Sequence, residues 1–135
     1  MAGERSGQLR TGRVASLTRV IVKHVRPAGR VKRTGDLFIG EHEYQNAIGS
    51  ESAQFRMSEL TFRDGARTKM HVHDSEQVVL VTAGEGIVAT GAEEQRIGVG
   101  DVALIPAGEP HWHGAPAGGA FTQWSILGPH ATRLA

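Results

Sequence analysis

The pattern of hydrophobic and polar positions predicts many short strands. From residue 35 onward, glycine and proline recur at short intervals and divide the chain into brief apolar or alternating segments. No segment keeps a 3.6-residue periodicity long enough for a major helix, and there is no internal repeat. The predicted strands are residues 14–25, 37–44, 54–62, 68–73, 77–82, 87–90, 95–97, 102–105 and 121–127. So many strands without intervening helices predict an antiparallel all-β sandwich or barrel.

Length and composition indicate one domain with an N-terminal extension. The chain has 135 residues and no cysteine, which allows a hydrophobic core and excludes disulfides, thiolate metal sites and a cysteine nucleophile. Residues 1–12 combine Gly, Ser, Gln and charge and are predicted to be disordered. We therefore divide the chain into a basic N-terminal arm, residues 1–34, which is partly disordered and then forms an edge strand, and a barrel, residues 35–135.

Charge is distributed unevenly between these two parts. Residues 1–33 contain nine Arg or Lys and one acid, a net charge of +8, whereas residues 34–135 contain six Arg or Lys and thirteen acids, a net charge of −7. The arm could contact nucleic acid or phosphate, but it lacks interleaved aromatic residues and any nucleic-acid motif. We therefore favour a solvated tail. Without an apolar run of membrane-spanning length or a secretory signal, we expect no membrane contact and a cytoplasmic location.

Two His-x-His pairs carry the candidate chemistry, His71 with His73 and His111 with His113. Residues i and i+2 of a strand share a face and lie roughly 6.6 Å apart along it. Two imidazoles at that spacing can converge on one metal ion. A single pair of this kind is weak evidence, because such pairs also occur on protein surfaces.

Glycines and a proline around these pairs sharpen the prediction. Two spaced sets are present, namely Gly65, His71, His73, Gln77 and Gly84, then Gly100, Pro106, Gly108 and His111. Both resemble the two motifs of the cupin superfamily, with Gln77 where an acid is usual and Ala115 where Asn is usual. The run His111-Trp112-His113-Gly114 is similar to the second motif of some small single-domain cupins. The resemblance extends from about residue 35 to 127 and implies a jelly-roll barrel, the double-stranded β-helix.

The resemblance also implies one divalent metal ion bound by His71, His73, Gln77 and His111. Neutral imidazoles suit Mn, Fe, Co, Ni, Cu or Zn, whereas Ca and Mg prefer oxygen ligands. With Gln77 in place of a carboxylate, the ligand set leaves the full +2 charge on the ion, which favours Lewis-acid chemistry and anionic ligands. Glu76 competes for the fourth position. Spacing to Gly84 favours Gln77, and Glu76 then faces outward or contacts the ligands from behind.

Several further residues are candidates for contact with a small-molecule ligand. His113 shares a face with His111 and is the first candidate for proton transfer, unless it is a surface histidine beside the site. On the last strand Gln123 and Ser125 alternate with Trp124 and Ile126, and only one of these two sets faces inward. An inward Gln123 would bind a substrate oxygen. Tyr44, Glu59 and Arg67 are candidates for the mouth of the barrel, where Arg67 would clamp a carboxylate.

Three functions, from two classes, follow from this site. The first is a metal-dependent enzyme that uses Lewis-acid chemistry on a small oxygenated organic acid or enol, as an isomerase, lyase or hydrolase. An Fe- or Cu-dependent dioxygenase is the alternative within the same class. A non-catalytic cupin that binds a small ligand is the third, and the fold alone does not choose among them. Because Val20, Ile21 and Val22 could extend a partner's sheet, we expect a strand-exchanged homodimer.

Overall fold

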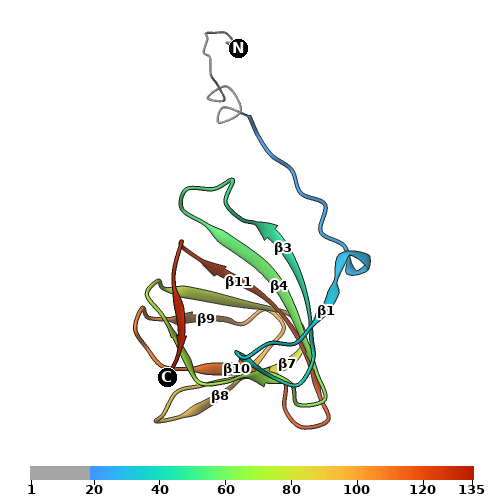
Figure 1. Cartoon of the computed structure of the whole chain (residues 1–135). Helices are drawn as coiled ribbons and strands as arrows, with labels where there is room; N and C mark the ends of the chain where they lie inside the picture. Colours follow the sequence, from blue (N-terminus) through green and yellow to red (C-terminus); the bar gives the residue numbers. More distant parts are fainter. Residues whose placement is uncertain (1–18) are drawn as a thin grey trace.

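The computed structural model describes residues 19–135, and Figure 1 shows strands that curl around a central interior. Antiparallel pairing joins them into a ten-stranded sheet and a two-stranded sheet. The larger sheet has the order β1-β3-β4-β11-β7-β10-β5-β2, with β8 and β9 also paired to β7, and the smaller one pairs β12 with β6. This architecture confirms the predicted all-β class and the curled, barrel-like jelly-roll arrangement.

All of the strands are short except β7. Their bounds are β1 Val31–Arg33, β2 Phe38–Ile39, β3 His42–Ile48, β4 Arg56–Arg63, β5 Arg67–Thr68, β6 His71–His73, β7 Gln77–Ala89, β8 Glu94–Gly98, β9 Val102–Ile105, β10 Trp112–Gly114, β11 Ala120–Leu127 and β12 Thr132–Leu134. A 3-10 turn, η2, covers Pro27–Gly29. Over residues 19–135, no helix is long and apolar enough to cross a membrane.

Strand β7 connects the two sides of the barrel. Its first part pairs with β9 and β11, and its second part pairs with β8 and β10. The two parts were predicted as separate strands, 77–82 and 87–90, because Gly84 lies between them. Gly84 has a φ of +71°, and a Cβ atom there would lie 2.1 Å from the carbonyl oxygen of Ala120. The glycine therefore lets a continuous strand bend against β11 instead of ending it.

Two other predicted strands are divided in the structure. The segment predicted at 37–44 becomes β2 and the start of β3, because Gly40 has a φ of +83°. The segment at 68–73 becomes β5 and β6, which belong to different sheets. By contrast, the strand predicted at 102–105 is β9 without change, and those at 54–62 and 121–127 differ from β4 and β11 only at their ends.

The arm reaches the barrel as an extended segment. Predicted disorder at residues 1–12 lies outside the described residues, as do positions 14–18 of the predicted strand 14–25. The prediction is wrong for residues 19–25, which form no strand and leave Val20 91% exposed. Strand β1 then pairs with β3, while Lys23 and Arg30 form ion pairs with Glu51 and Glu59. A strand needs a neighbouring edge, and among residues 19–135 no strand pairs with residues 19–25.

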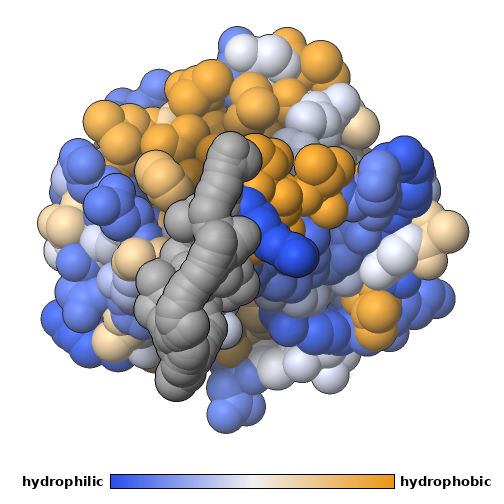
Figure 2. Space-filling model, turned by 90° about the horizontal axis from the view of Figure 1, so that it is seen from above, coloured by the Kyte–Doolittle hydropathy of each residue, from blue (hydrophilic) through white to orange (hydrophobic). Residues whose placement is uncertain are grey.

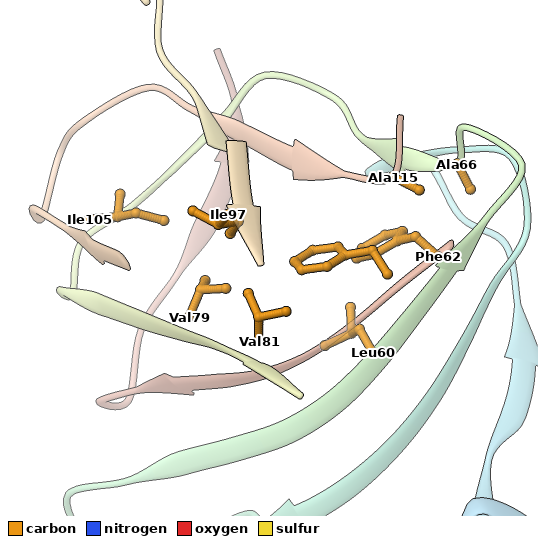
Figure 3. Close-up of a cluster of buried hydrophobic side chains, with 9 residues drawn as sticks. Leu60, Phe62, Ala66, Val79, Val81, Ile97, Ile105 and Ala115 are labelled. Carbon is orange, nitrogen blue, oxygen red and sulfur yellow. The ribbon is translucent and has the colours of Figure 1, made fainter. Parts of the chain in front are cut away.

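The hydrophobic core lies between the strands, as Figure 3 shows. Phe62 from β4 and Phe121 from β11 are buried, and their rings stack with centroids 6.2 Å apart. The remaining members are smaller side chains from both sides of the barrel, namely Leu60, Ala66, Val79, Val81, Ile97, Ile105 and Ala115. This packing holds the strands that carry the site.

A further set of apolar side chains lies on the outside. Figure 2 shows hydrophobic residues gathered on one side of the face from which the arm leaves. Exposed apolar side chains include Val20, Ile21 and Val22 of the arm and Val99, Val102 and Leu104 around β9. A contiguous apolar patch such as the one in Figure 2 is typical of a surface that contacts another molecule.

Candidate metal centre

Three histidines from two segments of the chain converge inside the barrel. His71 and His73 are the ends of β6, and His111 pairs with His71 through reciprocal backbone hydrogen bonds of 2.9 Å just before β10. One ring nitrogen from each of the three lies within 4.8 Å of the others. All three side chains are buried. Imidazoles that the sequence separates by about forty positions therefore meet around one point, as predicted.

Each of these histidines has its Nδ1 atom fixed by a hydrogen bond. The Nδ1 atom of His71 donates to the carbonyl oxygen of Lys69 at 2.7 Å, and that of His111 donates to the carbonyl oxygen of Glu109 at 2.8 Å. His73 uses the hydroxyl of Thr132, at 2.8 Å. A neutral imidazole that donates through Nδ1 carries a lone pair on Nε2. His71 and His111 therefore carry a lone pair on Nε2, and His73 carries one in the tautomer whose Nδ1 donates to Thr132.

Burial keeps these three rings neutral. It lowers the pKa of His71 and of His73 to about 4, and it lowers the pKa of His111. Neighbouring imidazoles lower the pKa of His71 and His73 further, because protonation of one ring disfavours protonation of the next. Neutral imidazole is the protonation state that binds metal ions.

Gln77 completes the cluster. It begins β7, is buried, and its Nε2 atom donates to the hydroxyl of Ser125 at 2.8 Å. Its Oε1 atom therefore faces the other way and lies 3.1 Å from Nε2 of His111. The neighbouring Glu76 is exposed, as an alternating strand requires when Gln77 faces inward. The side chain at position 77 thus faces the histidines, and the one at position 76 does not.

These residues fit a divalent transition-metal ion. The Nε2 atom of His73 is buried and has no hydrogen-bond partner among residues 19–135. The Oε1 atom of Gln77 and the Nε2 atom of His111 are both acceptors, so their close approach is unfavourable unless a positive charge lies between the lone pairs. Three imidazole nitrogens with one amide oxygen are ligands typical of Mn, Fe, Co, Ni, Cu or Zn.

A cavity of about 450 Å³ opens onto the histidines. His71, His73, Gln77 and His113 line one part of it, with Ser125 beside them. Apolar side chains form much of the remaining wall, including Leu37, Phe38, Met57, Leu60 and Leu127. The volume lies in the range of small-molecule sites, so a small organic ligand can reach the histidine cluster.

His113 and Gln123 lie deeper in the interior. The rings of His113 and His111 are stacked with centroids 5.8 Å apart, and burial holds the pKa of His113 well below its usual value. The Nδ1 atom of His113 and both polar side-chain atoms of Gln123 are buried without a hydrogen-bond partner among the described residues. Strand β11 turns Gln123 and Ser125 inward and Trp124 and Ile126 outward, which decides an alternative that the sequence left open.

The other predicted contact residues divide between inside and outside. Tyr44 lines the cavity. Glu59 instead faces outward, where Arg30 donates two hydrogen bonds to it at 2.8 and 3.1 Å. Arg67 lies over the ring of Trp112, with Cζ 4.1 Å from the centroid, and is not part of the cavity wall. The expectation that Glu59 and Arg67 line the mouth is therefore corrected, because strand alternation directs them away from the interior.

Sequence reasoning missed three residues at this site. Ser125 orients Gln77, Thr132 orients His73, and Arg33 lies in the cavity wall. Ser125 had a usable signal, because it alternates with Trp124 on the same strand as Gln123. Thr132 and Arg33 come from β12 and β1, which no hydrophobic pattern predicted.

Comparison with known proteins agrees with this geometry. A cupin-domain family model matches residues 58–122, a range that contains His71, His73, Gln77 and His111. An (R)-mandelonitrile lyase from Granulicella tundricola is 43% identical over 68 residues, which are 50% of this chain and 52% of the relative. The matched region thus spans about half of the length of that curated relative.

Solved structures share the fold. A cupin-like protein from Thermotoga maritima is 28% identical with a TM-score of 0.68, and the match covers 74% of this chain and 81% of that one. The polyketide cyclase RemF from Streptomyces resistomycificus has a TM-score of 0.73 at 18% identity, covering 85% and 86% of the two chains. At 18% identity the second likeness concerns the fold alone.

Proposed function

This chain is a small cupin-domain protein, and we propose that it is a metal-dependent lyase acting on a small oxygenated organic molecule. The observation that carries the proposal is the cluster of buried, neutral imidazoles at His71, His73 and His111, whose Nδ1 hydrogen bonds direct lone pairs toward a shared point. Buried polar groups without partners are costly, so such a cluster indicates a bound cation. The adjoining cavity supplies room for a substrate.

The residues present divide the chemistry among them. His71, His73, His111 and Gln77 would hold the ion, which would act as a Lewis acid on a substrate oxygen. Because none of these ligands is an anion, the ion would keep its full positive charge. Ser125 holds the Gln77 amide with its oxygen toward the histidines. Gln123 is buried with both polar atoms unpaired among residues 19–135, and it is not one of the residues that line the cavity.

His113 is the proposed proton carrier. It is buried, lines the cavity and stacks beside His111. In the proposed reaction, the substrate hydroxyl gives its proton to His113 and becomes a carbonyl as the bond from its carbon to the leaving group breaks. The leaving group departs with the bonding electron pair and receives the proton from His113. Atoms and charge balance without an external oxidant or reductant.

Lyase chemistry is favoured over the other Lewis-acid reactions by one comparison. The curated relative with 43% identity over the matched region is an (R)-mandelonitrile lyase. The match concerns half of each chain, so it supports the type of reaction and leaves the substrate open. A reaction at a carbon that bears a hydroxyl group would use an ion held by the histidines as Lewis acid and the buried imidazole of His113 in the cavity wall.

The test is metal loading followed by turnover. Full-length protein is reconstituted separately with Mn, Fe, Co, Ni, Cu and Zn, and aldehyde release from mandelonitrile and related hydroxy compounds is followed by absorbance. We expect close to one ion per chain, turnover with at least one metal, and loss of both in a variant with His71→Ala and His73→Ala. His24→Ala, which removes an exposed histidine of the arm, is the matched control.

Two results would contradict the proposal. One is the absence of metal after reconstitution of folded protein. The other is substrate-dependent oxygen consumption in the same panel without carbonyl release, which would favour the dioxygenase alternative. Ligand binding without any turnover would favour a non-catalytic binding cupin.

A further inference from the structure

The cavity beside the histidine cluster has an unbalanced charge. Two arginines, Arg33 and Arg56, are part of its wall, and no Asp or Glu is among the residues that line it within the described chain. The imidazoles contribute no compensating negative charge. Like charges at a cavity wall attract a ligand of the opposite sign, so this wall favours an anion.

The guanidinium of Arg56 already forms hydrogen bonds within the protein. Its Nη1 atom lies within hydrogen-bond distance of the carbonyl oxygens of Gly49, Ser52 and Phe55, at 3.1, 2.7 and 2.9 Å. These contacts fix the loop between β3 and β4. The guanidinium of Arg56 therefore has a structural role, which leaves Arg33 as the arginine to consider for a ligand.

Arg33 ends β1 and differs from the basic residues beside it. Arg30 pairs with Glu59 and Lys32 with Glu41, whereas no carboxylate of residues 19–135 lies within 4.0 Å of the Arg33 guanidinium. Its Cζ atom lies 3.7 Å from the centroid of the Tyr44 ring. Stacking on an aromatic face orients a guanidinium while leaving the N–H groups at its edge available for hydrogen bonds.

We propose that Arg33 binds the carboxylate of the substrate, so that the protein acts on a small carboxylate with an apolar body. This inference rests on the proposed function, because it names the substrate class of the same site. The planar fork of a guanidinium matches the two oxygens of a carboxylate. Leu37, Phe38 and Leu60 in the same wall provide contacts for the apolar part of that molecule. The cavity of about 450 Å³ limits the ligand to small organic acids.

The origin of Arg33 adds to the argument. It belongs to the basic arm, and the pairing of β1 with β3 places Arg33 opposite His42 and Val31 opposite Tyr44. The arm therefore contributes a side chain to the cavity while most of its charge serves other contacts. The sequence suggests that the basic arm is a solvated tail. One of its residues, Arg33, nevertheless selects the ligand.

The test compares an acid with its neutral amide. Binding of phenylacetate and phenylacetamide to metal-loaded, full-length protein is measured by isothermal titration calorimetry. We expect phenylacetate to bind about fivefold more tightly than the amide, the scale of a partly exposed ion pair. Arg33→Gln should remove this preference. Lys32→Gln removes the same charge from the adjacent, outward residue and should keep the preference.

Equal affinities for the acid and the amide in the wild-type protein would overturn the inference, and so would an Arg33→Gln variant that keeps the wild-type preference. Failure to bind phenylacetate at all would overturn it too. The proposed function is judged separately by metal content and carbonyl release. Turnover without a carboxylate preference would contradict this inference alone, whereas a preference without turnover would contradict the lyase proposal alone.

Discussion

The hydroxyl of Thr132 lies 2.8 Å from Nδ1 of His73 and orients that ring from the C-terminal strand. Backbone carbonyls of Lys69 and Glu109 do the same for the other two histidines. A backbone carbonyl remains after a side chain is replaced, but the Thr132 hydroxyl does not. His73 is therefore the histidine that can lose its orienting hydrogen bond through a single substitution, while every candidate ligand stays unchanged.

We expect Thr132→Val to weaken metal binding by about tenfold or more, the usual effect of losing a hydrogen bond that orients a ligand. Valine keeps the shape of threonine and removes the acceptor. Thr132→Ser is the matched control and should bind metal as tightly as the wild type. Competition titration against a chromophoric chelator measures the affinity. A Thr132→Val protein with wild-type affinity would show that His73 needs no such support.

Replacing Gln77 by Glu tests the charge of the proposed ligand set. A carboxylate in place of the amide would attract the ion more strongly, so we expect metal affinity to rise on the order of tenfold. The same added charge would reduce the Lewis acidity of the ion, so kcat should fall. Chelator competition and steady-state kinetics measure the two effects in one preparation.

The control for this substitution is Glu76→Gln. It changes the charge by one at the adjacent residue, which is exposed, and should alter neither affinity nor kcat. If Glu76→Gln weakens metal binding while Gln77→Glu has no effect, the fourth ligand position belongs to residue 76.

Much of the barrel could be predicted from the sequence because glycine and proline mark the ends of many of its strands. β9 matches its predicted range of 102–105, and β4 and β11 were found with small differences at their ends. The histidine cluster was also predictable, since His-x-His within a strand places two rings on one face and the second motif supplies His111. These features depend on local spacing, which a sequence displays directly.

Contacts between distant, weakly patterned segments could not be predicted. All three residues of β12 are exposed, so no hydrophobic alternation marks the strand that carries Thr132. The same holds for β1, which carries Arg33. Arg67 and Glu59 were placed at the mouth on residue type alone, and strand register directed both of them outward. The side on which a polar residue falls is decided by pairing partners that lie far away in the chain.

The ion pair between Arg30 and Glu59 should make the free energy of unfolding depend on pH. Hydrogen bonds from Arg30 hold the pKa of Glu59 below its usual value. The ion pair therefore contributes fully to the free energy of unfolding at pH values above about 4.3, the pKa of Glu in an unfolded chain. That contribution is lost as pH falls through the lower, folded pKa. We expect Glu59→Gln to lower the free energy of unfolding by about 2 kcal/mol at pH 7, and by less at pH 3.

Urea denaturation at the two pH values checks this expectation. Glu85→Gln is the control, because Glu85 pairs with Arg96 where both side chains are more than half exposed. It should change stability by less than about 1 kcal/mol at either pH. A Glu59→Gln protein that loses the same stability at pH 3 as at pH 7 would show that packing, and not charge, explains the loss.

Gly86 tests how tightly the core is packed around β7. A Cβ atom at this position would lie 2.5 Å from the ring of Phe121, which is buried in the core. We expect Gly86→Ala to lower the free energy of unfolding by about 1–3 kcal/mol, because the ring must shift. Gly91→Ala, where a Cβ would meet nothing within 4 Å, is the control. Equal midpoints of thermal unfolding for the two variants would contradict this account.

The outer apolar surface leads to the last prediction, a homodimer. Residues 20–22 of the arm are exposed and apolar, and β1, to which they lead, is the outermost strand of its sheet. A second copy offers both an apolar outer surface and an acidic body of net charge −7 to an arm of net charge +8. We therefore propose that the arm of one copy lies on the barrel of another, which would provide a pairing strand that residues 19–25 lack among the described residues.

Sedimentation velocity should then give twice the 14.4 kDa mass of one chain. Substituting Val20 and Val22 by Asp should produce the monomer, because burying two carboxylates at an apolar contact is unfavourable. Ala92→Asp is the control, since Ala92 is exposed in the turn between β7 and β8 and is not part of the outer apolar surface. If the wild-type protein sediments as a monomer at high concentration, or if the arm variant remains a dimer, the arm does not hold the two copies together.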